Sequence, residues 1–354
     1  MTDQTSPRDA ERLRDSEDDH QHREDDVQHQ REQHALDRSL PPRLEGNDSV
    51  FTVIVALVAN GLLATAKTVA AFLTGSASMA AEAAHSWADT GNEVFLLIAE
   101  RLGNKPRDAE HPRGYGRATY IWSLVAAFGL FSAGAVLSIW HGVTELLSGE
   151  AAGETSYTVN YVVLGIAFVL EGASFVQASR QVRSSARSWG LHPLRFVYRT
   201  SNPTLRAVFF EDFSALLGLV LAAMGIGLHQ LTGNVAYDAI GSILIGVLLG
   251  VVAVFLMSRN MQYLLGEGIG TDMWRVVLAA LLDHPEIDRI TYLHVEYVGP
   301  QRLFVVAAVD LHGDDPESHL ALRFRAVERD IERNSLIEDA ILTLAPPDEP
   351  ALTP

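Results

Sequence analysis

The stretch FTVIVALVANGLLATAKTVAAFLT (residues 51–74) has the length and the apolar composition of a membrane-spanning helix. A helix needs roughly 20 such residues to cross the hydrocarbon core of a bilayer. Further stretches of the chain have the same character, and together they predict an all-α, six-helix transmembrane bundle. The other five stretches are 77–100, 118–147, 158–180, 204–231 and 237–258.

Composition divides the 354 residues into unlike parts. Residues 1–49 are acidic and contain several histidines, and they hold too little apolar surface to fold alone, so we expect a disordered tail. We expect a six-span transmembrane domain over 50–260, a small domain over 268–346 and a tail over 347–354. The chain contains no cysteine, which excludes a disulfide framework, a cysteine zinc site and thiol chemistry.

The charges of the connecting segments predict the orientation of the chain. Lysine and arginine gather in two connections, 101–117 and 180–206, and the second of these has no acidic residue. The connections at 75–76, 148–157 and 232–236 contain neither lysine nor arginine. Because basic loops stay in the cytoplasm, we expect both termini on the cytoplasmic side.

After the last apolar stretch, the sequence predicts a small cytoplasmic α+β domain. Residues 271–283 and 316–334 have the pattern of helices, whereas residues 290–298 and 302–312 alternate like two strands joined by a turn. A short last strand at 337–345 completes the order αββαβ, a ferredoxin-like arrangement.

The second apolar stretch carries ionisable residues, and these need a reason to be there. An aspartate at the centre of a membrane helix costs about 2.5–3.5 kcal/mol on insertion scales. His85 and Asp89 are four residues apart, so a helix places them on one face, one turn from each other. An imidazole and a carboxylate in this position can share a divalent cation. The same pair can also form a hydrogen-bonded clamp between helices, and the spacing alone leaves both interpretations open.

Glu211 and Asp212 stand near the beginning of the fifth apolar stretch, within FFEDFSALLG (209–218). Acidic groups at membrane depth on two helices favour a shared cation over two unrelated clamps. Adjacent helical residues point about 100° apart, so the two side chains do not face one ion equally, and Asp212 is the better ligand candidate. Other polar residues of the apolar stretches are predicted to form interhelical hydrogen bonds, namely Asn60, Asn92 and Asp238.

Longer motifs at the ends of the apolar stretches carry a family resemblance. They are GSASMAAEAAHSWADTGN (75–92), HPRGYGRATYIWSL (111–124), YDAIGSILIGVLLG (237–250) and LLGEGIG (264–270). With these motifs, most of residues 51–345 resembles the cation diffusion facilitator family of divalent-metal/proton antiporters. The segment RSWGLHPLRFVYRTSNPTLRAVFFEDFSALLG (187–218), followed by LTGNVAYD (231–238), is similar more narrowly to the zinc-transporter-nine branch of that family.

The resemblance implies a transport site built from a pair of ligands on the second helix and a facing pair on the fifth. By position, His85, Asp89 and Asp212 match three of these four places, and Val208 occupies the fourth. Tetrahedral zinc takes four nitrogen or oxygen donors. The missing donor is therefore Glu211, an acidic residue of the fourth stretch or a water molecule.

Two more acidic residues of the apolar stretches have alternative interpretations. Glu171, in the fourth stretch, is either a proton carrier or outer ligand of the metal site, or the structural partner of Lys67 in the first stretch. Glu82 lies one turn before His85 and is either an outer-shell partner of that histidine or a residue of helix packing.

The sequence therefore predicts a secondary transporter, with no enzymatic activity and no prosthetic group. We expect Zn²⁺ to leave the cytoplasm in exchange for protons, because histidine and carboxylates bind either a metal or a proton. A site rich in oxygen also admits Mn²⁺, Fe²⁺ or Co²⁺, and the alternative from another class is a metal-sensing or structural membrane protein without transport. The expected partners are the metal ion, protons, the lipid bilayer of a prokaryotic inner membrane and, by the resemblance, a second copy of the chain, but no nucleic acid.

Overall fold

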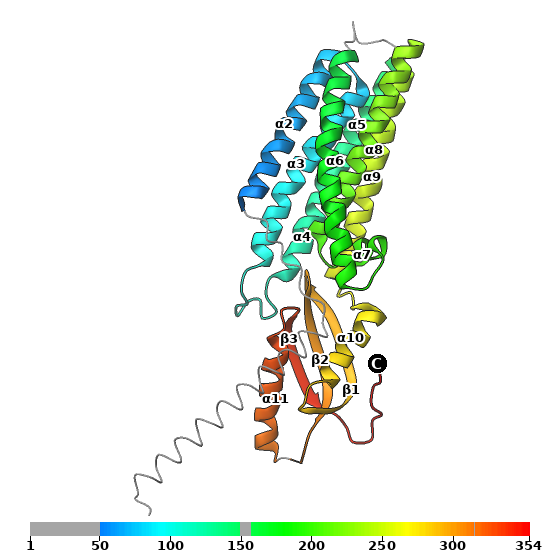
Figure 1. Cartoon of the computed structure of the whole chain (residues 1–354). Coiled ribbons are helices and arrows are strands. Elements are labelled where there is room, and N and C mark those ends of the chain that lie inside the picture. Colours follow the sequence, from blue (N-terminus) through cyan, green and yellow to red (C-terminus); the bar gives the residue numbers. More distant parts are fainter. Residues whose placement is uncertain (1–49, 149–156, 315) are drawn as a thin grey trace, which may run out of the picture. The chain divides into compact units, whose positions relative to one another are not determined.

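The protein is described by a computed structural model that covers residues 50–148, 157–314 and 316–354. The prediction for the tail at 1–49 lies outside these residues. The chain forms two compact units (Figure 1). One unit contains the helices α2 to α9 and residues 297–302, and the other contains Gly268–Glu296 and Leu303–Pro354.

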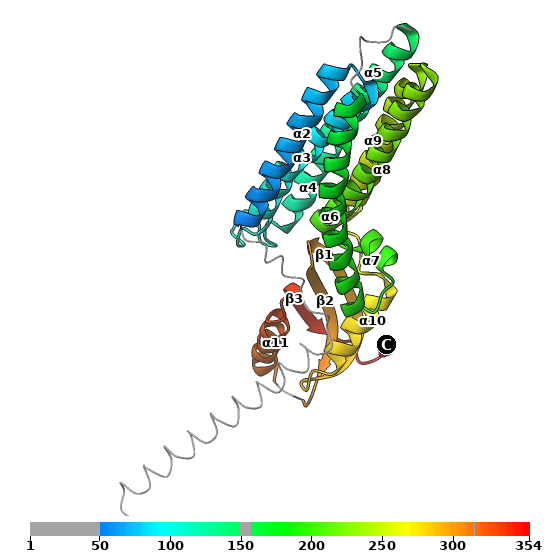
Figure 2. The same ribbon diagram turned by 45° about the horizontal axis from the view of Figure 1, so that its top comes forward.

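Long helices build the first unit (Figures 1 and 2). In chain order they are α2 (Val50–Thr74), α3 (Ala77–Gly103), α4 (Gly116–Ala126), α5 (Ser132–Ser148), α6 (Tyr157–Ser188), α8 (Pro203–Thr232) and α9 (Ala236–Leu264). A π-helical segment, Ala127–Phe131, joins α4 to α5, so these two helices cover one predicted stretch. The elements confirm the six predicted helical stretches.

The helix that carries the polar motif differs from the others. By length and composition, α2, the α4–α5 segment, α6, α8 and α9 are long and apolar enough to span a membrane, whereas α3 is not among these five. Instead, α3 packs against α2, α4, α5, α8 and α9. These neighbours shield the polar residues of α3 from the surroundings of the bundle.

Local turn chemistry fixes where the helices begin and end. Gly75 has a φ of 61°, and Ser76 caps α3 by accepting a hydrogen bond from the backbone N–H of Met79 (3.2 Å). The side chain of Asn202 caps α8 in the same way, and α8 ends at Gly233 with a φ of 70°. The reversals between helices are therefore encoded in short polar and glycine-containing segments.

The arginine-rich connection at 180–206 is largely helical. Helix α6 continues to Ser188, and a short helix, α7 (Pro193–Arg199), follows it. Phe196 and Val197 of α7 are buried in a cluster with Val182 of α6. The apolar face of α7 is only a few residues wide, so its burial depends on these partners and is not visible as a periodic pattern.

The connection between α3 and α4 is organised around Asp108. Its carboxylate accepts hydrogen bonds from the Tyr115 hydroxyl (2.6 Å) and from the backbone N–H groups of His111 (2.7 Å) and Glu110 (3.0 Å). The bond from Tyr115 and that from His111 lower the pKa of Asp108, and the bond to Asp108 raises the pKa of Tyr115 to about 12. Asp108 is therefore ionised at neutral pH, and it orders the HPRGYGR motif.

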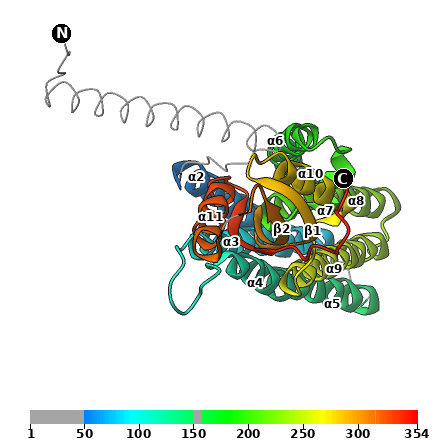
Figure 3. The ribbon, with the colours of Figure 1, turned by 90° about the horizontal axis from the view of Figure 1, so that it is seen from below.

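Helices α5 and α9 lie side by side (Figure 3), and glycines allow the backbone of one helix to lie close to the other. A Cβ added at Gly142 would lie 2.6 Å from the carbonyl oxygen of Ala239 and 3.1 Å from the backbone nitrogen of Ile243. At Gly246, an added Cβ would lie 2.9 Å from the carbonyl oxygen of Ala135. Small residues allow helices in a membrane to pack this closely.

Replacing Gly142 with alanine should lower the stability of the helical unit, because the added methyl group meets backbone atoms that cannot rotate away. Overpacking of this kind typically costs about 1–3 kcal/mol. The thermal transition of the purified protein in detergent measures the effect. Gly165→Ala is the matched control, since a Cβ at that position meets no atom of the described structure within 4 Å. Equal transition temperatures for the two variants would contradict the prediction.

The C-terminal elements follow the predicted αββαβ order. They are α10 (Gly270–Leu282), β1 (Ile287–Gly299), β2 (Arg302–Leu311), α11 (Glu317–Glu332) and β3 (Ile337–Leu344). The strand order of the sheet is β1-β2-β3, and β2 pairs with β3 in parallel. The register of this pair includes Val305 opposite Ala340, and β3 packs against α11. The sequence therefore predicts this small α+β fold correctly.

Candidate metal-binding site

One face of α3 carries the polar residues that the sequence singles out. Glu82, His85 and Asp89 repeat at helical spacing, and Glu82 and His85 are fully buried. The Nε2 atom of His85 lies 3.6 Å from Oδ1 of Asp89. The structure thus brings the predicted pair together, inside the bundle.

Helix α8 brings a second group of polar atoms to this face. The hydroxyl oxygen of Ser214 lies 3.4 Å from His85 Nε2. Glu211 is buried and accepts a hydrogen bond from Asn92 of α3 (2.5 Å), whereas Asp212 accepts one from Ser174 of α6 (2.8 Å). The two adjacent acidic residues therefore point to different neighbouring helices, as their 100° separation on a helix requires.

The carboxylates around Asp89 are electrostatically linked, although they are not assembled around one point. Glu211, Glu171 and Asp212 all act on the charge of Asp89. Within the described ranges, no three histidine, aspartate or glutamate side chains are close enough to hold one ion. Glu211 and Asp212 take hydrogen-bond partners on different helices, Asn92 of α3 and Ser174 of α6. The ligand set His85, Asp89, Asp212 and Glu211 therefore stays a prediction.

Val208 contributes no donor at the position where the family resemblance places a ligand. It is half-buried and packs against the apolar core of the bundle. Its side chain has no lone pair that can bind a metal. A fourth ligand, if the site has one from the protein, must come from another residue.

Lysine 67 of α2 is a buried cation beside this site. It is fully buried, and its Nζ atom donates hydrogen bonds to Glu82 Oε2 (3.0 Å) and to the Ser86 hydroxyl (2.7 Å). Glu171 of α6 lies 3.7 Å from the same Nζ atom. The structure therefore places Glu171 beside Lys67, which is the structural pairing that the sequence analysis raised, and also within electrostatic reach of Asp89.

Glu93 belongs to the same polar face, although it is not among the site residues predicted from the sequence. It follows Asp89 by four residues, and it accepts a hydrogen bond from Asn60 of α2 (2.6 Å). Its charge also acts on Glu211 of α8. The continued spacing of 85, 89 and 93 was the available signal for this residue.

The predicted interhelical hydrogen bonds are confirmed. Asn60 bonds to Glu93, and Asn92 bonds to Glu211, as described above. Asp238 of α9 accepts a hydrogen bond from the backbone N–H of Ser78 on α3 (3.3 Å). These bonds tie α3 to α2, α8 and α9.

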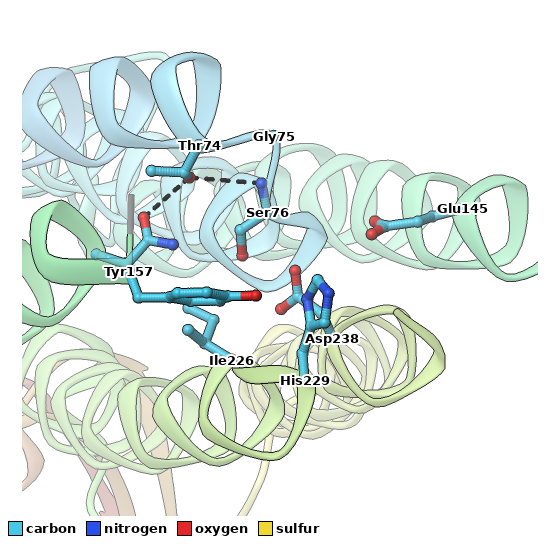
Figure 4. A pocket seen from close by; sticks show the side chains of 9 residues that line it. Thr74, Gly75, Ser76, Glu145, Tyr157, Ile226, His229 and Asp238 are labelled. Atoms are coloured by element: carbon cyan, nitrogen blue, oxygen red, sulfur yellow. Dashed lines mark hydrogen bonds between the residues drawn. The ribbon is translucent and has the colours of Figure 1, made fainter. Parts of the chain in front are cut away.

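A small polar cavity lies where the α2–α3 turn meets α5, α6, α8 and α9 (Figure 4). Its lining includes Thr74, Ser76, Glu145, His229 and Asp238, and it has room for about one water molecule. Thr74 donates to the amide oxygen of Asn160 (2.9 Å) at its edge. His85 and Asp89 are not among the residues that line this cavity.

Membrane-length helices that enclose buried histidine, lysine and carboxylates define the class of the molecule: it is a multi-pass integral membrane protein with a charged site inside its helical bundle. Residues 53–265 match the cation efflux transmembrane domain. The chain therefore belongs to the cation efflux family.

Curated relatives agree with this membership. The chain is 37% identical over 261 residues to the mitochondrial proton-coupled zinc antiporter SLC30A9 of Xenopus laevis, which covers 74% of this chain and 46% of that protein. It is 34% identical over 261 residues to the human protein of the same name, with the same coverage. It is also 34% identical over 273 residues to metal tolerance protein C4 of Arabidopsis thaliana, covering 77% of this chain and 59% of that protein. The chain thus spans about half the length of the curated relatives it matches.

Proposed function

We propose that the protein exports Zn²⁺ from the cytoplasm in exchange for protons, by alternating access. The observation that carries the proposal is the His85–Asp89 pair, with Nε2 and Oδ1 3.6 Å apart, buried inside a bundle of membrane-length helices. The names of the relatives in two animals, proton-coupled zinc antiporters, support the same activity. The proposed activity is transport and not catalysis, and zinc is the cargo of the protein and not a prosthetic group.

The proposed metal ligands are His85, Asp89 and Asp212, with Glu211 as the fourth donor. Glu211 is buried and acts electrostatically on Asp89, which makes it a better candidate than a residue on the outer surface. In the described conformation, an asparagine and a serine hold the two acidic residues of α8. Each of these bonds engages one carboxylate oxygen, which leaves Glu211 Oε2 and Asp212 Oδ1 to bind the ion.

Neutralising Asp212 should weaken zinc binding more than neutralising Glu211, because Asp212 is the proposed ligand at the position that matches the family's site. We expect Asp212→Asn to raise the dissociation constant for zinc more than about a hundredfold, a larger loss than is usual for an outer-shell residue. Glu211→Gln should raise it less. Calorimetric titration of the two purified variants in detergent measures both constants, and the reverse order would make Glu211 the principal ligand of α8.

Proton coupling follows from the chemistry of the ligands. A carboxylate or an imidazole must be free of its proton to bind zinc, so protons and zinc compete for the same lone pairs. Glu171 and Glu82 are proposed to serve proton coupling or the outer shell of the site, because Glu171 acts on the charge of Asp89 and Glu82 lies one turn from His85.

The proposed arrangement in the cell rests on the charges of the connections. The basic segments 101–117 and 180–206 favour a cytoplasmic location for both termini, in the inner membrane of a prokaryote. The proposed domains are the tail over 1–49, the transport domain over 50–260, a cytoplasmic domain over 268–346 and a last tail over 347–354. A homodimer is the proposed assembly, on the strength of the family resemblance.

A flux assay in reconstituted vesicles tests the proposal. We expect zinc to enter vesicles whose lumen is acidic, the lumen to become less acidic as it does so, and a protonophore to abolish the stimulation. Mn²⁺, Fe²⁺ and Co²⁺ in parallel vesicles establish the metal selectivity, and faster flux of one of these would replace zinc as the cargo. If no divalent metal crosses in any gradient, while zinc still changes the conformation of the C-terminal unit, the protein is a sensor and the transport proposal is wrong.

A further inference from the structure

Two buried atoms of the candidate site border the same gap without a hydrogen-bond partner. Neither Glu82 Oε1 nor His85 Nδ1 has a partner among the residues that the structure describes. A Cβ added at Gly218 of α8 would lie 2.4 Å from Glu82 Oε1 and 3.5 Å from His85 Nδ1. Buried polar atoms are rarely left unpaired in folded proteins, so two such atoms at one place require an explanation.

The opposite atoms of the same two side chains are already engaged. Glu82 Oε2 accepts a hydrogen bond from Lys67 Nζ (3.0 Å). His85 Nε2 lies 3.6 Å from Asp89 Oδ1 and 3.4 Å from the Ser214 hydroxyl. Lys67 thus holds one oxygen of Glu82, and His85 Nε2 faces Asp89 and Ser214. The two atoms left between them, Glu82 Oε1 and His85 Nδ1, have no hydrogen-bond partner in the described part of the chain.

We infer that Glu82 is a positioning residue for the metal site and that Lys67 fixes Glu82 for this task. In the metal-bound site, Glu82 Oε1 accepts the Nδ1–H of His85, a bond that the described conformation does not contain. This bond keeps the imidazole in the tautomer with its lone pair on Nε2 and directs that lone pair toward Asp89. Histidines that bind metals commonly donate their other ring N–H to a carboxylate in this way. The inference rests on the proposed zinc-binding function, which it deepens.

Lys67 and Gly218 have separate parts in this arrangement. Lys67 binds Oε2 of Glu82, so only Oε1 remains for His85, and its positive charge compensates the buried carboxylate. Gly218 leaves the space in which Oε1 and Nδ1 can meet, because an alanine there would collide with Oε1 at 2.4 Å. Lys67 and Gly218 therefore offer two independent ways to disturb the proposed bond between Glu82 and His85.

A matched pair of double variants separates the hydrogen bond from the charges. Lys67→Met/Glu82→Gln and Lys67→Met/Glu82→Leu both remove the buried ion pair, but only the glutamine retains an oxygen that accepts from His85 Nδ1–H. We expect the leucine variant to bind zinc about ten- to a hundredfold more weakly than the glutamine variant, as is usual when the outer partner of a metal-bound histidine is lost. Calorimetric titration with ZnCl₂ of the full-length protein in detergent gives the two dissociation constants.

The zinc affinities of these variants decide between a positioning role and a purely structural role of Glu82. Equal zinc affinities of the two double variants would overturn the inference, because a purely structural or electrostatic role predicts equality. If the double variants do not fold, Gly218→Ala, which keeps every charge, is compared with Gly165→Ala. An unchanged affinity in Gly218→Ala would likewise overturn the inference, and a loss of about tenfold or more would support it. The wild-type protein is titrated alongside, and absence of zinc binding there overturns the proposed function and this inference with it.

Discussion

Replacing Asp89 with alanine is expected to abolish zinc-for-proton exchange in reconstituted vesicles. Asp89 is the carboxylate that pairs with His85 Nε2, and the charges of Glu211, Glu171 and Asp212 all act on it. Asp89 therefore combines a direct approach to the histidine with electrostatic influence from the other carboxylates. The loss of an outer partner costs about ten- to a hundredfold, so the loss of a ligand itself should lower the initial rate more than about a hundredfold.

The control for this substitution is Glu317→Ala, which removes an exposed carboxylate of α11. Both variants are reconstituted at equal density, and zinc entry is followed with a fluorescent indicator inside the vesicles. Asp89→Asn is included because it preserves the shape of the side chain and removes only its charge. A native rate in Asp89→Ala would remove Asp89 from the transport site and leave the transport proposal itself standing.

Hydrophobic periodicity and length account for most of the fold. The runs near 51–74 and 237–258 are apolar over a membrane-spanning length, and the alternation at 302–312 defines a strand, so each element follows from its own residues. Helix α7 does not follow from its own residues in this way. Phe196 and Val197 are buried against residues of α6 and α8, and they do not form a regular apolar pattern that the sequence alone would reveal. The π-helical segment at Ala127–Phe131 also has no sequence signal that the prediction used.

In the candidate site, too, the sequence predicts what lies on one helix but not the contacts between helices. The spacing of His85 and Asp89 follows from a single helix, and it was predictable from the sequence. The hydrogen-bond partners of Glu211 and Asp212 were not predictable from the sequence. Periodicity does not say which helix lies beside α8 or how far that neighbouring helix is rotated about its axis. Glu93 was missed for a related reason: its i+4 spacing was visible, but its bond to Asn60 depends on the packing of α2 against α3.

Lys67 is a buried lysine that is surrounded by carboxylates inside the helical bundle. Glu82 and Glu171 lie within 3.7 Å of its Nζ atom, and Asp89 acts on its charge. A lysine inside a membrane is costly unless it is paired, and the same holds for each of these carboxylates. The ion pair of Lys67 with Glu82 is therefore mutually dependent, since removing either partner leaves the other charge buried.

Replacing Lys67 alone with methionine should accordingly have the largest effect on stability. The substitution fits the volume of the site but leaves the Glu82 carboxylate without its counter-charge, and breaking a buried ion pair by removing one partner costs about 3–5 kcal/mol. The temperature of the thermal transition of the variant in detergent should fall clearly below that of the wild-type protein.

Lys67→Met/Glu82→Leu removes both charges together, and exchange of a whole buried pair for apolar residues is often neutral or stabilising. The double variant should therefore be more stable than Lys67→Met alone, although Glu171 still lacks its lysine partner. Its zinc affinity then reports on His85 in a folded protein. A single variant as stable as the wild type would mean that Glu82 takes up a proton or is solvated by water, and that Lys67 does not hold Glu82 in place.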